Sequence, residues 1–354
     1  MHRLKRYLPL AIMALMVTAV QLLTFYTGTA YYLTQLTITA YYGLLITGLC
    51  VLMGYAGQLS LGHAGFFAIG GYVSAALTTH DLTACRDSFF VTLLNHAHLL
   101  ISRQDIYGEP LLTVKAWPAC LAAIAAALLI AFIIGIPVLR LKGHYLAMAT
   151  MGFGIIIFRI VMASTYFGEA DGISDVPAFT LLPGLTVSGD FSYRVQNYYI
   201  AWALIMIGMF LLINLTDSRP GRALRAIHGS PEAAEAVGIN TARYKLSTFV
   251  ISAAFAAVAG VFLTHFNGGI GPSEASVMKS VRYVAIIAIG GMASLWGALS
   301  MGVILNFLSL RGVFGSYDDA VFGAILVLVM LFAPHGILRL PIWRKLNFRR
   351  PTDD

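Results

Sequence analysis

Ten apolar segments limit the fold of this chain more than any other feature of its sequence. A helix needs about 20 mostly apolar residues to cross the hydrocarbon core of a bilayer. The segments that best fit this pattern lie at residues 8–27, 31–53, 65–79, 112–139, 144–163, 197–215, 244–266, 278–292, 296–310 and 319–334. Only 11% of the 354 residues are charged, against about 25% in an ordinary soluble domain. The sequence therefore predicts an all-α polytopic membrane protein with about ten transmembrane helices.

Two irregular regions give the predicted number of crossings a range of eight to ten. Segment 65–79 is short for a span, and the pair between residues 278 and 310 is broken at Gly290-Gly291 and Gly297. Continuous hydrophobicity favours a single transmembrane domain over residues 1–340, followed by a basic tail over residues 341–354.

Lysines and arginines are concentrated in loops that fall on one side of the membrane if the chain crosses ten times. The four clusters are Arg3, Lys5 and Arg6; Arg140 and Lys142; Arg219, Arg222, Arg225, Arg243 and Lys245; and Arg339, Arg344, Lys345, Arg349 and Arg350. Positive charge marks the cytoplasmic side of membrane proteins. We therefore expect cytoplasmic termini, a cytoplasmic loop 217–243, and external loops 80–111 and 164–196. The same pattern accounts for the net charge of +7 without a nucleic-acid partner.

Glycines and polar side chains break the apolar block between the second and third segments, over residues 54–65. Non-helical backbone at membrane depth is tolerated only where it is buried in protein or lines a water-filled cavity. Broken helices often mark substrate pathways in transporters. The stretch is thus either part of a path or a tight cytoplasmic turn whose glycines allow close helix packing. The spacing alone leaves both interpretations open.

The loop 217–243 contains the sequence of one short, complete helix. Ser230 suits the N-cap, Pro231 the first helical position, and Gly238 the left-handed position after the last turn. Glu232 and Glu235 suit the positive end of the helix dipole. Because two turns of helix are marginal alone in water, we expect this helix to dock, either on its own membrane domain or on a partner.

Several sequence patterns typical of enzymes are absent. The chain has no Gly-x-x-x-x-Gly-Lys-Ser/Thr phosphate loop and no Gly-Lys dipeptide, so it cannot bind ATP by that device. It also lacks His-Glu-x-x-His, Gly-x-Ser-x-Gly and paired intramembrane carboxylates. The three cysteines are scattered and give no metal-ligand spacing. We therefore expect neither an intramembrane enzyme nor a cofactor or metal bound by this chain.

Several sequence blocks resemble the M-type permeases of branched-chain amino-acid (Liv-type) ABC importers. The blocks are Gly57-Gln58-Leu59-Ser60-Leu61-Gly62-His63-Ala64; Pro137-Val138-Leu139-Arg140-Leu141-Lys142-Gly143-His144-Tyr145-Leu146-Ala147; Gly152-Phe153-Gly154; Asp171-Gly172-Ile173-Ser174; Gly221-Arg222-Ala223-Leu224-Arg225-Ala226-Ile227; Glu232-Ala233-Ala234-Glu235-Ala236-Val237-Gly238-Ile239-Asn240; Tyr244-Lys245; Gly290-Gly291; and Ser294-Leu295-Trp296-Gly297. They follow the order and spacing of that family over about residues 54–335.

The resemblance implies a permease subunit of the bacterial inner membrane that moves branched-chain or other hydrophobic amino acids, or a related small carboxylate, into the cytoplasm by alternating access. Its partners would be a second homologous permease, two ATPase subunits that use ATP and Mg, and a periplasmic solute-binding protein. The helix of Ser230, Pro231, Glu232, Ala233, Ala234, Glu235 and Gly238 would be the coupling helix that contacts the ATPase. Candidate path residues are Gly57, Gln58, Ser60, Gly62, His63, Arg282, Gly290 and Gly291. The alternative is an ion- or proton-coupled secondary transporter that works alone.

The chain departs from the family pattern in three places. The loop 80–111 is longer than expected for the family. Ile155 stands at one position where the family commonly has Glu, and Arg282 stands at another, shortly before Gly290-Gly291. An arginine inside a span is usually paired or functional, whereas one near the external end reaches water along the helix. Loss of two acids and gain of Arg282 predict an electropositive path and suggest a solute that carries a carboxylate without an ammonium group.

Overall fold

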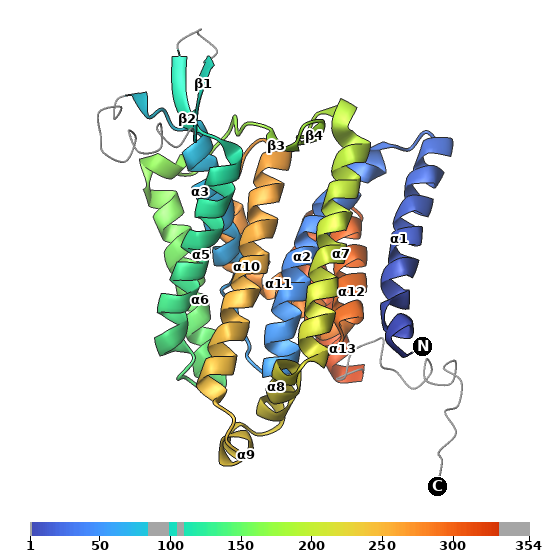
Figure 1. Cartoon of the computed structure of the whole chain (residues 1–354), viewed down its shortest axis with the longest axis vertical. Helices are drawn as coiled ribbons and strands as arrows, with labels where there is room; N and C mark the ends of the chain where they lie inside the picture. Colours follow the sequence, from blue (N-terminus) through green and yellow to red (C-terminus); the bar gives the residue numbers. More distant parts are fainter. Residues whose placement is uncertain (1, 84–98, 105–109, 333–354) are drawn as a thin grey trace.

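The computed structural model describes residues 2–83, 99–104 and 110–332, and most of these lie in long helices that run side by side (Figure 1). These helices are α1 (His2–Tyr26), α2 (Tyr31–Ala56), α3 (His63–Thr79), α5 (Ala116–Val138), α6 (His144–Ala163), α7 (Arg194–Asp217), α10 (Thr241–Asn267), α11 (Val277–Gly290), α12 (Leu295–Leu310) and α13 (Asp318–Phe332). Shorter pieces are α8 (Arg219–Gly229), α9 (Pro231–Ala236) and the single-turn helices η2 (Thr165–Phe167), η3 (Phe191–Tyr193), η4 (Pro272–Ala275) and η5 (Gly315–Tyr317). The antiparallel hairpins are β1 (Leu100–Gln104) with β2 (Pro110–Val114), and β3 (Phe179–Leu182) with β4 (Leu185–Val187).

Each of the ten predicted segments contains a helix, which confirms the all-α polytopic class. Among the described residues, α1, α2, α5, α6, α7 and α10 are long and apolar enough to cross a membrane. The helices α3, α11, α12 and α13 are shorter, with 17, 14, 16 and 15 residues. Because these four are shorter than a full span, the count of ten crossings stays a prediction.

The structure differs from the sequence prediction at the start of α5 and in the loop that contains α8. The predicted span 112–139 begins inside β2, and α5 starts only at Ala116, because Leu112 and its neighbours pair with β1. The sequence prediction also omits α8, whose N-cap Ser218 accepts a hydrogen bond from the Gly221 N–H. The basic tail 341–354 and much of the loop 80–111 lie outside the described residues.

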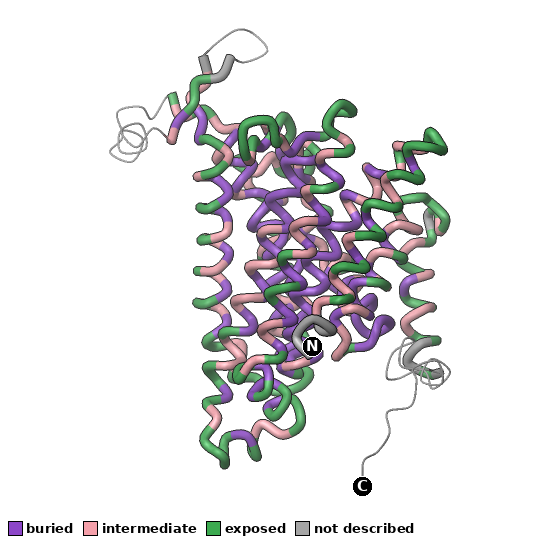
Figure 2. Tube along the Cα trace, turned by 45° about the vertical axis from the view of Figure 1, so that its right-hand side comes forward, coloured by how far each residue is buried: buried purple, intermediate pink, exposed green. Residues whose placement is uncertain are grey.

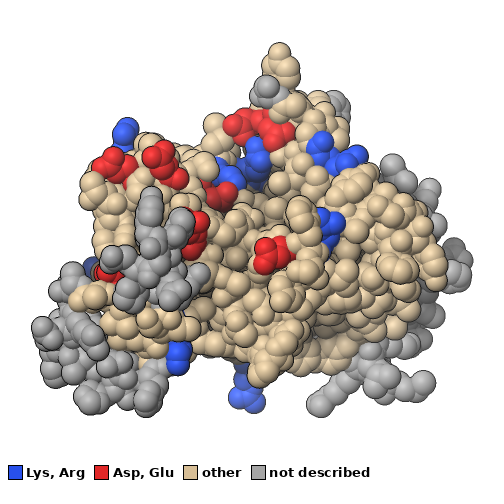
Figure 3. Space-filling model, turned by 90° about the horizontal axis from the view of Figure 1, so that it is seen from above, with Lys and Arg blue, Asp and Glu red and all other residues tan. Residues whose placement is uncertain are grey.

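The bundle has two chemically different ends. Figure 1 shows α8 and α9 at one end, here called the α9 end, and the two β-hairpins at the other, here called the hairpin end. Helix α1 begins and α13 ends at the α9 end, as an even number of crossings requires. The basic loops around Arg140 and residues 219–225 lie at the α9 end. The hairpin end carries acidic side chains together with lysines and arginines (Figure 3).

The core of the bundle is formed by α2, α3 and α10, and the outer faces of α1, α5 and α6 are exposed and apolar (Figure 2). Glycines allow the central backbones to approach closely. A Cβ atom on Gly260 of α10 would lie 2.0 Å from the Phe67 carbonyl oxygen of α3, and one on Gly70 would lie 2.3 Å from the Ala257 carbonyl oxygen. Small residues at helix contacts are a common basis of packing within membranes, where water is absent.

The first irregular segment, residues 57–62, enters the bundle from the α9 end after α2 has ended. It rises to His63, the first residue of α3, which contacts Ser252. Ser252 lies close to the midpoint of α10. Helix α3 therefore begins near the middle of the bundle, although it ends at the hairpin end.

The second irregular segment, residues 268–276, enters from the hairpin end after α10 has ended. Glu274 in this segment contacts Tyr42, which lies close to the midpoint of α2. Helix α11 therefore also begins near the middle and runs to the α9 end. The two broken elements meet at mid-depth from opposite ends.

We expect Gly260→Ala to destabilise the protein, because the added methyl group must push α3 and α10 apart against backbone atoms. The matched control is Gly152→Ala on α6, where a Cβ atom meets nothing within 4 Å. Both changes improve helix propensity by about 1 kcal/mol, so they differ only in packing. The apparent unfolding temperature in detergent should fall for Gly260→Ala and hold or rise for Gly152→Ala. Equal shifts would contradict the packing account.

We expect the α9 end to face the cytoplasm. Reporter fusions after Arg140 and after Asp217 should show cytoplasmic activity, and fusions within residues 170–190 should show external activity, because the basic clusters are retained on the cytoplasmic side. A fusion at the C-terminus should also be cytoplasmic. An external C-terminus would show that one of the shorter helices does not cross.

Candidate functional site

The segment 57–62 is buried at Gln58, Ser60 and Gly62 and exposed at Gly57 and Leu59. Gly57 adopts φ of 66°, a left-handed conformation that ends α2 and turns the chain back inward. Gln58 and Ser60 are only 3% and 2% exposed. The Leu61 N–H donates to Thr150 Oγ1 of α6 at 3.0 Å. The irregular backbone thus finds its hydrogen bonds inside the protein, as its depth requires.

His63 connects this segment to two helices. Its Nδ1 lies 2.9 Å from Ser60 Oγ, and its Nε2 lies 2.7 Å from Ser252 Oγ on α10. The ring is fully buried, and the adjacent Ala64 N–H donates to Ser280 Oγ of α11 at 3.1 Å. His63 therefore holds the start of α3 against α10, and the next residue holds it against α11.

The remaining residues of the stretch leave little open space between them. A Cβ atom on Gly62 would lie 2.6 Å from the Thr150 carbonyl oxygen, so glycine is needed there for packing. Within the described residues, the buried Gln58 Oε1 has no hydrogen-bond partner. The predicted role of these residues in a path stays a prediction, because in this structure they form a packed junction between helices.

Glu274 and Lys279 form an ion pair at the start of α11. Lys279 Nζ lies 2.8 Å from Glu274 Oε1 and 2.9 Å from Tyr42 Oη. The Tyr42 hydroxyl lies 3.0 and 3.1 Å from the two oxygens of Glu274. The predicted spans 244–266 and 278–292 leave Glu274 in a loop between them. The structure differs, because the segment 268–276 carries Glu274 down to the middle of α2.

Arg282, the predicted path residue one turn further along α11, is paired with carboxylates. Its Nη2 lies 2.9 Å from Asp319 Oδ1 and 3.6 Å from Asp318 Oδ2 on α13. Its guanidinium also lies over the Phe322 ring, 4.4 Å from the centroid. The expectation of an electropositive path is wrong for the described residues here, because two carboxylates face this one arginine.

Gly290 and Gly291 lie apart from the other candidate path residues, at the turn between α11 and α12. Gly291 has φ of 98°, and a Cβ atom on Gly290 would lie 2.4 Å from the Gly297 carbonyl oxygen. A Cβ atom on Gly54 would lie 1.6 Å from the Met292 carbonyl oxygen of the same turn. Close packing at the α9 end accounts for these glycines, and their part in a path stays a prediction.

Helix α9 confirms the short helix predicted from its caps. Ser230 Oγ accepts the Ala233 N–H at 3.2 Å, and Gly238 has φ of 84° after the last turn. Ala234 is buried, so the helix docks on the chain's own α8 and α10 through this side chain. Val237, which the sequence analysis did not single out, is 76% exposed at its tip.

Lys142, from the turn between α5 and α6, reaches α9. Its Nζ donates to Glu232 Oε1 at 2.9 Å, and both side chains are mostly exposed. This hydrogen bond from Lys142 is the main reason why the pKa of the Glu232 carboxyl lies below its ordinary value. An exposed ion pair stabilises little, so its effect is to orient the loop relative to α9.

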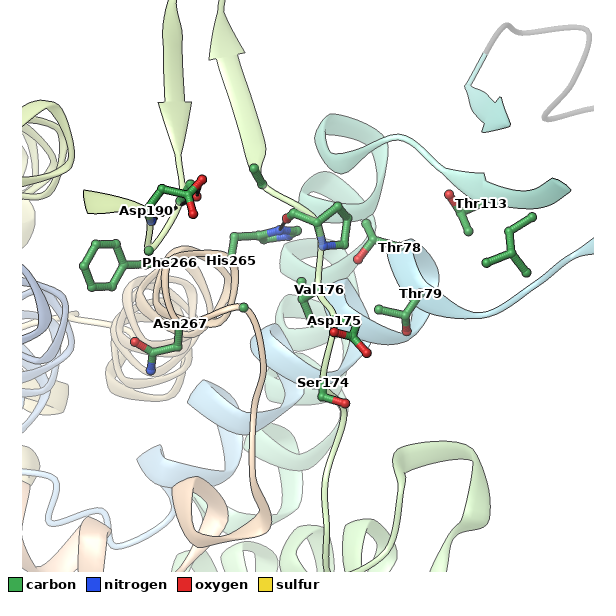
Figure 4. Close-up of a pocket in the computed structure, with 16 residues that line it drawn as sticks. Thr78, Thr79, Thr113, Ser174, Asp175, Val176, Asp190, His265, Phe266 and Asn267 are labelled. Carbon is green, nitrogen blue, oxygen red and sulfur yellow. Dashed lines mark hydrogen bonds between the residues drawn. The ribbon is translucent and has the colours of Figure 1, made fainter. Parts of the chain in front are cut away.

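A cavity of about 840 Å³ opens at the hairpin end (Figure 4). Asp190 lines it from the β4 side, Asp175 from the extended segment after η2, and Thr78 and Thr79 from α3. Its wall includes His265, which bonds Ser74 Oγ at 2.8 Å and the Pro177 carbonyl at 2.7 Å. The predicted external loop 164–196 thus forms part of a polar vestibule over α3 and α10.

Comparison with known proteins places the chain in a family. Residues 31–330 match the family described as the permease component of the branched-chain amino acid transport system. The chain is 31% identical to the high-affinity branched-chain amino acid transport system permease protein LivM of Escherichia coli, over 85% of this chain and 68% of that protein. It is 29% identical to LivH of the same organism, over 88% of this chain and 96% of LivH. It is also 29% identical to BraD of Pseudomonas aeruginosa, over 86% of this chain and 94% of BraD.

The matched region contains both broken helices, the helices α8 and α9, and the vestibule. The similarity therefore covers every element of the candidate site. A multi-pass membrane protein with these features and this match is a transport permease. The chain belongs to the family of branched-chain amino acid transport system permease components.

Proposed function

We propose that this chain is a transmembrane subunit of an ATP-binding-cassette importer that moves branched-chain amino acids into the cytoplasm of a bacterium. The observation that carries the proposal is α9, a capped two-turn helix at the basic end of a membrane bundle. The named relatives are permeases of branched-chain amino acid transport systems, which supports the solute class.

Helix α9 has the properties of a coupling helix. It is fixed to the membrane domain by the buried Ala234 and by the Asn240 cap, whose Oδ1 accepts the Arg243 N–H at the start of α10. It also exposes Ala233 and the apolar Val237. An exposed apolar residue on a rigid support suits a groove on a partner protein. Force on α9 would reach α10 through the cap and the α5–α6 turn through Lys142.

The energy would come from ATPase subunits bound at the α9 end. This chain contains no phosphate-binding loop, so ATP and Mg would be held by two such partners and the chain itself would bind no cofactor and catalyse no hydrolysis. A second homologous permease would complete the membrane unit in the inner membrane. The similarity to both LivM and LivH supports such a pair.

The vestibule at the hairpin end would receive the solute from a periplasmic binding protein. It is polar, and Asp175 and Asp190 line it without a lysine or arginine among its described lining residues. From there the solute would pass the two helix starts at mid-depth, where Ser60, His63 and Arg282 lie, toward the α9 end. The packed junction at His63 is then the barrier that alternating access must open.

A secondary transporter that works alone is the other candidate, and Glu274 is the observation in its favour. A carboxylate near the middle of α2 is the kind of group that carries protons in such proteins. Against it stands α9, which has no evident task in a transporter without a partner. Dependence of uptake on a hydrolysis-competent ATPase subunit separates the two.

We expect Val237→Asp to lower ATP-driven leucine uptake in proteoliposomes by about tenfold or more, because it places a charge in an apolar interface. Ser230→Ala, which removes one cap worth about 1 kcal/mol, should lower uptake less. The matched control is Val313→Asp, since Val313 is 62% exposed and lies in the turn between α12 and α13. Co-purification of ATPase subunits should weaken only in the α9 variants. Unchanged uptake and ATPase association in both would refute the coupling assignment.

A further inference from the structure

The ion pair of Glu274 and Lys279 lies at the middle of the membrane domain. Tyr42, which contacts both residues, is eleven positions from the start of α2, and a helix rises about 1.5 Å per residue. The pair is therefore about 16 Å below the end of α2 on the hairpin side. This depth is close to the centre of a bilayer whose hydrocarbon core is about 30 Å thick.

The pair keeps part of its hydrogen-bonding capacity free. Lys279 Nζ has three N–H donors. Two of them donate to Glu274 and Tyr42, and one is left. The Glu274 carboxylate has about four acceptor positions, of which the contacts with Lys279 and Tyr42 occupy three. The side chains are 24% and 17% exposed, so a bound molecule can reach both charges.

A neighbouring cavity of about 60 Å³ extends the pair toward further polar groups. Its walls include Lys279, Tyr42, Arg282 and Tyr283. The Tyr283 ring is 1% exposed, and its hydroxyl has no partner among the described residues. A buried hydroxyl without a partner marks a place where a polar group of a ligand or a water molecule belongs. The space admits a few water-sized groups, so it suits the carboxylate of a solute and not a whole amino acid. Glu274 lies outside its lining and contacts Lys279.

A purely structural role explains the pair poorly. Removing two charges from water costs several kcal/mol per ion, and apolar residues of similar volume often stabilise a buried site as well or better. Ionisable residues within a membrane domain are therefore functional candidates. The aromatic floor formed by Tyr42, with Lys279 Nζ 4.8 Å from the ring centroid, holds the ammonium in place without neutralising it.

We propose that Glu274 and Lys279 bind the ammonium and carboxylate groups of a zwitterionic solute as it passes the middle of the membrane. The inference rests on the proposed function, and it names the residues that read the solute's headgroup. The solute's carboxylate takes the free donor of Lys279 and the Tyr283 hydroxyl, while its ammonium takes the free acceptor of Glu274.

The charge balance of the pair selects a zwitterion. A molecule with one positive and one negative group adds no net charge to a site of low dielectric, and each group meets its opposite. A keto acid satisfies Lys279 and leaves Glu274 facing a like charge. The ammonium group of an amine pairs with Glu274 but leaves Lys279 facing a like charge. Arg282 adds no unpaired positive charge beside the pair, because Asp318 and Asp319 face it.

Met278 provides a reporter for occupancy, because it is 52% exposed and adjacent to Lys279. The whole complex carrying Met278→Cys is placed in nanodiscs and treated with a thiol reagent, and mass spectrometry measures the label at residue 278. Leucine should slow labelling at least about threefold, whereas its deaminated keto acid and its decarboxylated amine should not. Equal protection by leucine and the keto acid would overturn the proposal, as would no protection by leucine in a complex that transports it.

The double variant Glu274→Gln with Lys279→Gln tests the residues without leaving one charge unpaired. It should abolish protection by leucine and lower leucine uptake by at least about tenfold, the loss expected for one charge-assisted hydrogen bond. Glu169→Gln, which neutralises an exposed carboxylate of the loop 164–196, is the control and should change uptake less than about twofold. Co-purification of the ATPase subunits shows that each variant is assembled.

The two proposals fail in different ways. If the wild-type complex takes up no branched-chain amino acid, the proposed function is wrong. If it takes up leucine and the double variant does so at the same rate with the same protection, the pair is structural and only the present inference is wrong.

Discussion

The requirement that every backbone polar group inside a bilayer be satisfied by protein governs the arrangement of this structure. Two segments, 57–62 and 268–276, contain no α-helix where the chain passes through the bundle. Each is therefore packed against other parts of the protein and hydrogen-bonded to them. The Leu61 N–H finds Thr150 Oγ1, and Ile270 exchanges backbone hydrogen bonds with Ile173 of the loop before β3.

This requirement explains why α2, α3 and α10 are the buried centre of the bundle. A broken helix needs protein on all sides, so the unbroken helices α5, α6 and α1 are left to face the surroundings (Figure 2). The glycines at Gly70 and Gly260 bring the central helices close enough to seal the junction. Helix α10 runs unbroken past this junction, from the end next to α9 to His265 in the wall of the vestibule. It is the element in contact with both ends of the candidate site.

The same breaks bring charge to a depth that apolar helices exclude. Helix α11 begins halfway through the bundle, so the polar residues that precede and cap it lie there too. Ser276 caps α11, and Glu274 and Lys279 flank that cap. A continuous helix would have carried these residues to a surface, where water solvates them. The mid-depth ion pair is thus a consequence of the chain's path and not of an unusually polar span.

Local features that the sequence determined by itself include the approximate positions of the ten apolar helices and the caps of α9. Hydrophobic runs predict spans because lipid imposes their length, and caps such as Ser230 and Gly238 act within one turn of backbone. Motif order also indicated the family, because such blocks are read along the chain. The tertiary structure alone decided which residues meet across the bundle. Arg282 found Asp318 and Asp319, His63 found Ser252, and Glu274 reached Tyr42 across 232 positions of sequence. The depth of a residue and its charge partner depend on how helices far apart in the chain pack together. Local sequence periodicity carries no information about that packing.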